Sequence, residues 1–184
     1  EGDHQRRSRL HGPERGDRRA GRCYDQACRV SSLSSLLATF FGIGRIPFAS
    51  GTFASAAALP FGVLLVMRGW QVLALALLGV IVVGIWACGK HAAKLGVADP
   101  SECVLDEVAG QWITLMPVAF FGRPYDWPLY VIGFFLFRLF DVAKFWPMSA
   151  AEELPGGLGV MADDVLAGLI AAALFWAALA YGWV

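Results

Sequence analysis

Two long apolar segments constrain the fold of this 184-residue chain more than any other feature. Residues 69–88 and 165–184 carry no charged side chain. A helix of about 20 apolar residues is long enough to cross the hydrocarbon core of a bilayer, whereas ordinary strands are much shorter. Abundant Ala and Leu and the absence of polar–apolar alternation also favour helix. The sequence therefore predicts two transmembrane helices.

Composition extends this prediction to the rest of the chain. The sequence is 57% hydrophobic, above the ~45–50% of a typical soluble domain, and its mean hydropathy is +0.56. Three shorter apolar segments suit buried, re-entrant or tilted helices as well as spans: residues 54–67, 110–121 and 128–140. We predict an all-α, membrane-associated helical bundle with about two to four membrane-embedded helices.

The N-terminal segment differs from this apolar body. Eight of the fifteen Lys and Arg residues fall within residues 1–30, where aromatic residues are scarce. Such a composition is typical of a disordered tail, and its basic character fits a cytoplasmic N-terminus. We expect residues 31–184 to form one helical domain, because they contain no internal repeat or low-complexity linker.

Cysteine and histidine do not suggest a metal–thiolate site. The four cysteines form no CxxC pair and have no paired spacing with histidine, and the only histidine of the body, His91, is expected to cap or line a helix end. The formal net charge is zero, and we predict no nucleic-acid partner.

The acidic residues of the body are more informative. An ionised group in or near hydrocarbon is costly and usually faces the protein interior beside a partner. Ten acidic residues follow Val30, and seven of them lie in three short clusters, at residues 99–107, 137–144 and 156–168. These clusters are the candidate functional segments.

The first cluster combines a capping pattern with two further carboxylates. Residues 99–102 form a capping box with proline at the first helical position, so we expect a helix to begin there. Asp106 and Glu107 would then lie about two turns inside. Gly110 follows Asp106 by one turn and leaves space on the same face for another helix or a ligand.

The other two clusters place charges among apolar neighbours. Arg138, Asp141 and Lys144 follow one another at i,i+3 spacing between aromatic residues; an intrahelical salt-bridge ladder is the alternative interpretation. Three preceding glycines are expected to loosen the backbone, and Asp163 and Asp164 are expected to start a helix after them. A helix N-terminus would by itself favour Asp. Gly168 follows Asp164 by one turn, which is the same spacing as between Asp106 and Gly110.

A glycine-, serine- and threonine-rich turn, residues 42–55, leads into a predicted helix. Backbone N–H groups in such a turn can receive a phosphate, although a turn that caps its helix through Ser50 or Thr52 is equally ordinary. The segment is neither a P-loop nor a dinucleotide-binding loop.

Together, these residues predict a hard cation and an anionic partner. Carboxylate oxygens without a set of sulfur or histidine ligands favour Mg²⁺ or a similar ion, and the adjacent arginine and lysine favour a phosphate. A site embedded among apolar helices implies a lipid-borne substrate.

Four motifs, in order, resemble the phosphatidylglycerophosphatase A family over residues 36–173: GIGRIPFASGTFAS, DPSECVLDEVAGQWITL, FFLFRLFDVAKFWP and GGLGVMADDVLAG. The resemblance implies a Mg²⁺-dependent phosphatase of the bacterial inner membrane that converts phosphatidylglycerophosphate to phosphatidylglycerol, with its active site on the cytoplasmic face. It also implies a central helix surrounded by others. The site residues it implies are Asp106, Glu107, Arg138, Asp141, Lys144, Asp163 and Asp164.

Two departures from the family pattern lie beside these residues. Ser50-Gly51-Thr52 stands where the family usually has Pro-Gly-Thr, and residues 144–147 read Lys-Phe-Trp-Pro where it usually has Lys-Pro-Trp-Pro. Both changes bear on loop geometry, rate or headgroup preference more than on the reaction.

Our mechanistic hypothesis divides the charged residues into two groups. Five carboxylates together supply the metal ligands and a general base: Asp106, Glu107, Asp141, Asp163 and Asp164. The sequence does not assign one of these roles to each residue. Arg138 and Lys144 hold the phosphate, with Gly51, Thr52 and Ser55 as secondary candidates.

Two other functions compete with this hypothesis. In a small transporter or ion-conducting protein the same charges would line a pathway, but here the acids cluster at predicted helix starts rather than mid-span. A phosphatase of another lipid phosphate is the second alternative.

Overall fold

The computed structural model describes residues 32–97, 100–143, 146, 148–151 and 154–184. The predicted tail and Lys144 lie outside these residues. The described residues form helices and no strand, which confirms the all-α prediction. In order, the helices are α2 (Leu33–Ala38), η1 (Ile43–Arg45), α3 (Ser50–Met67), α4 (Trp70–Leu95), α5 (Leu105–Phe120), α6 (Trp127–Ala143), α7 (Met148–Ala151) and α8 (Gly157–Ala180).

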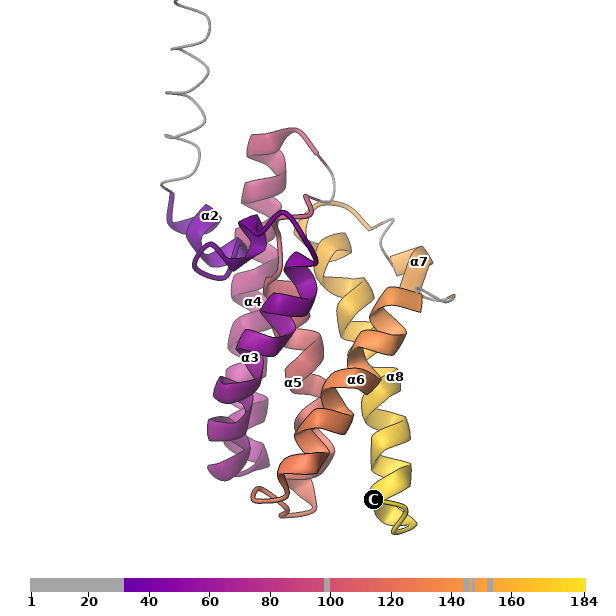
Figure 1. Ribbon diagram of the computed structural model, residues 1–184. Helices are drawn as coiled ribbons and strands as arrows, with labels where there is room; N and C mark the ends of the chain where they lie inside the picture. Colours follow the sequence, from indigo (N-terminus) through magenta and orange to yellow (C-terminus); the bar gives the residue numbers. More distant parts are fainter. Residues whose placement is uncertain (1–31, 98–99, 144–145, 147, 152–153) are drawn as a thin grey trace, which may run out of the picture. The chain divides into compact units, whose positions relative to one another are not determined.

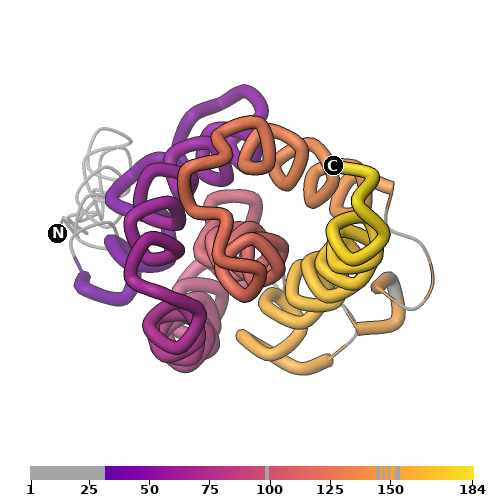
Figure 2. The backbone as a smooth tube through the Cα atoms, turned by 90° about the horizontal axis from the view of Figure 1, so that it is seen from below, coloured from indigo at the N-terminus to yellow at the C-terminus, as the bar shows by residue number. Residues whose placement is uncertain are grey.

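Helix α5 is the centre of the bundle. It packs against α3, α4, α6 and α8, which surround it in the view along the bundle (Figures 1 and 2). Thirteen of its sixteen residues are buried. The central helix implied by the family resemblance is therefore present.

Within the described part of the chain, three helices are long and apolar enough to cross a membrane: α3, α4 and α8. The two predicted spans overlap α4 and α8, although α8 begins earlier than predicted and ends at Ala180, and α3 adds a third candidate despite Pro60 in its interior. Large apolar side chains cover the outer surface, for example Leu75 on α4, which is 71% exposed. An outer surface of this kind fits contact with lipid, so the apolar helices indicate membrane association.

The predicted start of α5 is wrong. The helix begins at Leu105, and before it the N–H of Cys103 donates to the carbonyl of Pro100 in a turn. The N–H of Val104 donates to the carbonyl of Ala38, 3.0 Å away at the end of α2. Packing against α2 therefore overrides the local capping pattern, and Asp106 and Glu107 lie in the first turn.

The predicted start of α8 is also wrong. The helix begins at Gly157, so Asp163 and Asp164 lie nearly two turns inside it. Gly157 allows α8 to pack closely against α4 and does not loosen the backbone, because a Cβ there would overlap the carbonyl oxygen of Ile85 on α4.

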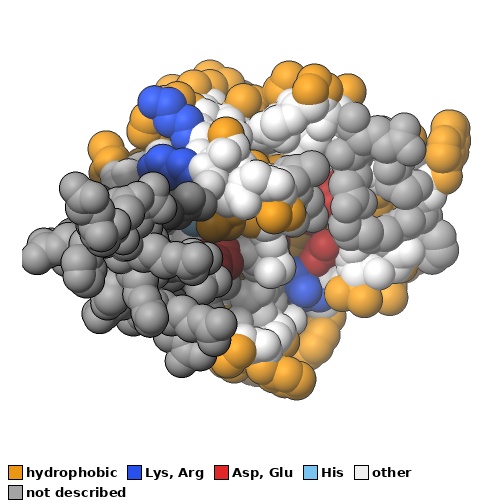
Figure 3. All heavy atoms as spheres, turned by 90° about the horizontal axis from the view of Figure 1, so that it is seen from above, with side chains coloured by type: hydrophobic (Ala, Val, Ile, Leu, Met, Phe, Trp, Pro, Cys, Tyr) orange, Lys and Arg blue, Asp and Glu red, His pale blue; other side chains and the backbone are white. Residues whose placement is uncertain are grey.

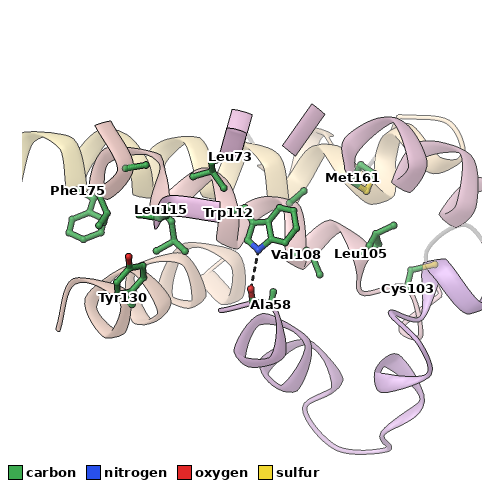
Figure 4. Packing of buried hydrophobic residues seen from close by; sticks show 14 of the residues in the cluster. Ala58, Leu73, Cys103, Leu105, Val108, Trp112, Leu115, Tyr130, Met161 and Phe175 are labelled. Atoms are coloured by element: carbon green, nitrogen blue, oxygen red, sulfur yellow. Dashed lines mark hydrogen bonds between the residues drawn. The ribbon is translucent and has the colours of Figure 1, made fainter. Parts of the chain in front are cut away.

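The core between these helices is apolar (Figure 4). Trp112 of α5 fills the space beside α3, and its indole N–H donates to the carbonyl of Ala58 at 3.0 Å. Leu73, Met161 and Phe175 reach the same core from α4 and α8. A buried indole of this size needs such a partner for its N–H group.

The backbones of α5 and α8 touch at two glycines. A Cβ on Gly168 would lie 2.6 Å from the carbonyl oxygen of Gly110, and a Cβ on Gly110 would lie 2.7 Å from the carbonyl oxygen of Asp164. No L side chain fits at these distances without moving one helix. The space predicted beside Gly110 is thus occupied by α8.

This contact leads to a stability prediction. Replacing Gly168 by Leu should separate α5 from α8 and lower the free energy of unfolding by about 2 kcal/mol or more. The matched control is Gly79→Leu on α4, where a Cβ meets nothing within 4 Å. Thermal unfolding in detergent, followed by circular dichroism, should show a fall for Gly168→Leu only. Equal unfolding temperatures in both variants would contradict the packing argument.

Candidate active site

The three acidic clusters meet at one end of the bundle. There α3, α5 and α8 begin and α6 ends, and the segment before α5 closes one side. Figure 3 shows this end with acidic and basic side chains lying together among apolar and polar neighbours. They surround a pocket of about 260 Å³ lined by Ser50, Pro100, Ser101, Cys103, Asp106, Glu107, Arg138, Asp141, Val142, Asp163 and Asp164.

All five predicted carboxylates and Arg138 line this pocket. Asp106, Asp163 and Asp164 are buried, at 4–9% exposure. Their burial follows from the crossing of α5 and α8, because Asp106 precedes Gly110 by one turn and Asp164 precedes Gly168 by one turn. The repeated spacing read from the sequence thus corresponds to one shared site.

Arg138 connects two of the carboxylates. Its Nη1 donates to Glu107 Oε2 at 2.9 Å across the α5–α6 interface, and also to Asp141 one turn along α6. Glu107 Oε2 accepts a further hydrogen bond from Ser55 Oγ at 3.0 Å. The predicted i,i+3 pair therefore exists, but it is part of a network between helices and not only an intrahelical ladder.

Burial also shifts the proton affinity of the carboxyls at the start of α5. Desolvation raises the pKa of Glu107 to about 7, although the Arg138 guanidinium opposes the shift. Desolvation, and next the negative charge of Glu107, raise the pKa of Asp106 well above its ordinary value. The Glu107 N–H donates to Asp106 Oδ1 at 2.9 Å and partly compensates. Ionising these carboxyls is therefore costly in the absence of a counter-charge, and an added cation would favour their ionised forms.

The donor set matches a hard divalent cation in chemical type, since it consists of carboxylate oxygens. The arrangement is not a preformed metal cage: within the described residues, no three Asp, Glu, His or Cys side chains are placed to hold an ion. Arg138 binds both Glu107 and Asp141 in this arrangement.

The N-terminal turns of α3 contribute in a different way from the prediction. Gly51 lies against the Glu107 carboxylate, which any Cβ at this position would overlap. Ser55 is fully buried under the same carboxylate, whereas Thr52 is exposed and does not line the pocket. The residue before α3 is Ala49, and neither Ser50 nor Thr52 forms a side-chain cap. Gly51 and Ser55 therefore support Glu107.

Sequence reasoning missed five lining residues: Ser50, Pro100, Ser101, Cys103 and Val142. Ser101 and Cys103 belong to the segment before α5, and Ser50 Oγ donates to the carbonyl of Ser101 at 3.2 Å. Their only signal in the sequence is their position: within the first acidic cluster, beside Gly51 or, for Val142, beside Asp141.

Comparison with known proteins decides the family. The family model described as phosphatidylglycerophosphatase A matches residues 36–179. The chain belongs to the phosphatidylglycerophosphatase A family. It is therefore a phosphatase, and this membership favours the enzyme over the transporter alternative.

Three bacterial relatives illustrate the family. The chain is 37% identical over 149 residues to phosphatidylglycerophosphatase A of Escherichia coli (80% of this chain, 84% of the relative). It is 42% identical over 152 residues to a Bacteroides thetaiotaomicron protein named "Putative phosphatidylinositol-3-phosphatase" (77% and 90%). Phosphatidylglycerophosphatase A of Haemophilus influenzae is 35% identical over 144 residues (77% and 86%). No solved structure matches the chain significantly.

The Arg138 network leads to a prediction about activity. Arg138→Lys keeps the charge but loses the planar guanidinium that reaches Glu107 and Asp141 together, so phosphatase activity should fall about 10- to 100-fold. The matched control is Arg123→Lys, at the opposite end of the bundle, whose partner Asp126 is also at i,i+3. Rates of phosphate release measure the effect. Wild-type rates for Arg138→Lys, or an equal loss for Arg123→Lys, would exclude this role.

Proposed function

We propose that this protein is a Mg²⁺-dependent phosphatase that hydrolyses phosphatidylglycerophosphate to phosphatidylglycerol and phosphate in phospholipid biosynthesis. The observation that carries the proposal is a pocket in which five carboxylates and Arg138 converge at the end of an apolar bundle, in a chain of this family. The relatives named phosphatidylglycerophosphatase A in Escherichia coli and Haemophilus influenzae support the choice of lipid.

The carboxylates of α5 and α8 are proposed to hold the ion. Asp106 of α5 and the pair Asp163 and Asp164 of α8 line the same pocket as Arg138, and we assign the ion to these three buried carboxylates. Bound Mg²⁺ would polarise a phosphoryl oxygen and offset the charge that develops there. The burial of these three aspartates supports the proposal, because a buried carboxylate is costly to ionise and a bound cation would offset that cost.

The basic residues are proposed to hold the phosphate. Arg138 can exchange part of its present pairing with the carboxylates for the substrate's phosphate oxygens, with Lys144 as the second cation. Water then attacks phosphorus in line with the glycerol oxygen. One carboxylate takes the water proton, the bond from phosphorus to the glycerol oxygen breaks, and this oxygen regains a proton as the new hydroxyl group.

The site is proposed to face the cytoplasm from the inner membrane. Of the described Lys and Arg residues, Arg45, Lys90, Lys94 and Arg138 belong to the end of the bundle that holds the pocket, and Arg68 and Arg123 to the other end. Basic residues collect on the cytoplasmic side of membrane proteins, which supports this orientation.

Substrate and metal can be tested together. Purified protein in detergent should release phosphate from phosphatidylglycerophosphate faster than from phosphatidic acid or a soluble phosphomonoester. Removing Mg²⁺ with EDTA should abolish the release, and added Mg²⁺ should restore it. Undiminished activity after EDTA would refute the metal requirement, and no release from this lipid by a folded sample would refute the substrate.

The aspartate pair of α8 gives a mutational test. Asp163→Asn and Asp164→Asn should each lower turnover by about 10²- to 10⁴-fold, since each removes a proposed ligand charge while keeping the side-chain shape. Asp126→Asn, outside the pocket, should have wild-type turnover. Full activity in both α8 variants would remove this pair from the chemistry.

A phosphatidylinositol 3-phosphate is the second candidate substrate. The Bacteroides thetaiotaomicron relative, at 42% identity, carries a name that specifies this activity. The same assay with phosphatidylinositol 3-phosphate decides between the two lipids: a higher kcat/KM for the inositol lipid would replace the first proposal.

A further inference from the structure

A second polar cluster lies at the same end of the bundle, outside the pocket. His91, near the end of α4, is only 3% exposed. Its Nδ1 lies 3.0 Å from Ser35 Oγ on α2, and its Nε2 lies 3.5 Å from Glu102 Oε2. Burying an imidazole is costly unless its nitrogens have polar neighbours. No step of the proposed hydrolysis uses these groups.

Glu102 connects this cluster to the pocket. It belongs to the segment 100–103 before α5, whose Pro100, Ser101 and Cys103 form one wall of the pocket. The segment is not helical, so it lacks the continuous hydrogen bonding that fixes α5. Its side-chain connection to α4 runs through Glu102 and His91.

Two other contacts define the same segment. Gly44 lies so close to the carbonyl of Glu102 that a Cβ there would overlap it, and Ser50 Oγ donates to the carbonyl of Ser101. These two contacts fix the position of the segment relative to η1 and α3. The contact with His91 adds an anchor on α4, the longest helix of the bundle.

We propose that His91 is a positioning residue for the phosphatase site: by holding Glu102 it fixes the 100–103 wall against the headgroup of the lipid phosphate. The tautomer with the proton on Nε2 directs its N–H toward the Glu102 carboxylate 3.5 Å away, and in that neutral ring Nδ1 can accept from the Ser35 hydroxyl. His91 itself does not line the pocket. The identity of the headgroup rests on the proposed function, whereas the contact between His91 and Glu102 does not.

The kinetic test uses Glu102, which is 42% exposed and lies outside the helices, so its replacement does not threaten the fold. Because the wall holds substrate in the ground and transition states alike, Glu102→Ala should raise KM for phosphatidylglycerophosphate about threefold to tenfold with little change in kcat. Glu102→Gln keeps an acceptor oxygen and should restore a KM near the wild-type value. His91→Gln should resemble Glu102→Ala, and the double variant should be no worse than either single variant.

A second readout does not depend on activity. Cys103 is a buried free thiol in the wall, so a displaced wall should expose it to N-ethylmaleimide. Peptide mass spectrometry separates its labelling from that of the other three cysteines. The full-length protein in detergent should label faster at Cys103 in Glu102→Ala and His91→Gln than in the wild type. The matched control is Lys90→Met, an exposed neighbour of His91 that stacks on Trp86.

The outcomes separate this inference from the proposed function. Faster labelling of Cys103 in both variants supports the positioning role even if the wild type releases no phosphate from this lipid, a result that would refute only the substrate. Unchanged labelling and unchanged KM in Glu102→Ala overturn it. Additive effects in the double variant, or equal changes in Lys90→Met, overturn it as well.

Discussion

The contact between the backbones of α5 and α8 at Gly110 and Gly168 determines the rest of the site. A helix crossing this close requires glycine on both sides, since any Cβ on Gly168 would meet the carbonyl oxygen or Cα of Gly110. One turn before each glycine stands an aspartate, and the crossing therefore brings Asp106 and Asp164 toward each other. A wider crossing would separate these two carboxylates and open the pocket that they line.

That proximity has an electrostatic cost, which Arg138 partly offsets. The Arg138 guanidinium and the Ser55 hydroxyl both donate to the Glu107 carboxylate. Gly51 leaves room for this carboxylate because it has no side chain. Buried carboxylates that lack a cation repel one another more strongly than they would in water. In the proposed mechanism, a bound divalent ion would offset this repulsion and would thereby favour binding of a phosphate.

The sequence predicts the long elements better than the boundaries. The spans in α4 and α8 were predictable because an uncharged segment of about 20 residues has few alternatives to a membrane helix. The starts of α5 and α8 were not, because the local signals at residues 99–102 and 156–159 compete with contacts that α2 and α4 make from far along the chain. Likewise, the spacing of Asp106 and Gly110 could predict a neighbouring helix, but nothing in the sequence indicates that Arg138 reaches Glu107, 31 residues away.

The position of the pocket at the end of the bundle fits the shape of a lipid substrate. Acyl chains are most stable in the hydrocarbon around α3, α4 and α8, while a phosphate is most stable where water, basic residues and a metal can reach it. An enzyme that keeps its carboxylates at the helix ends does not have to draw the headgroup into hydrocarbon. Asp106, Asp163 and Asp164 are accordingly buried where helix ends meet and not in the middle of the apolar bundle. The apolar surface that suits acyl chains and the pocket that suits a phosphate thus lie at different positions along the axis of one helix, α5.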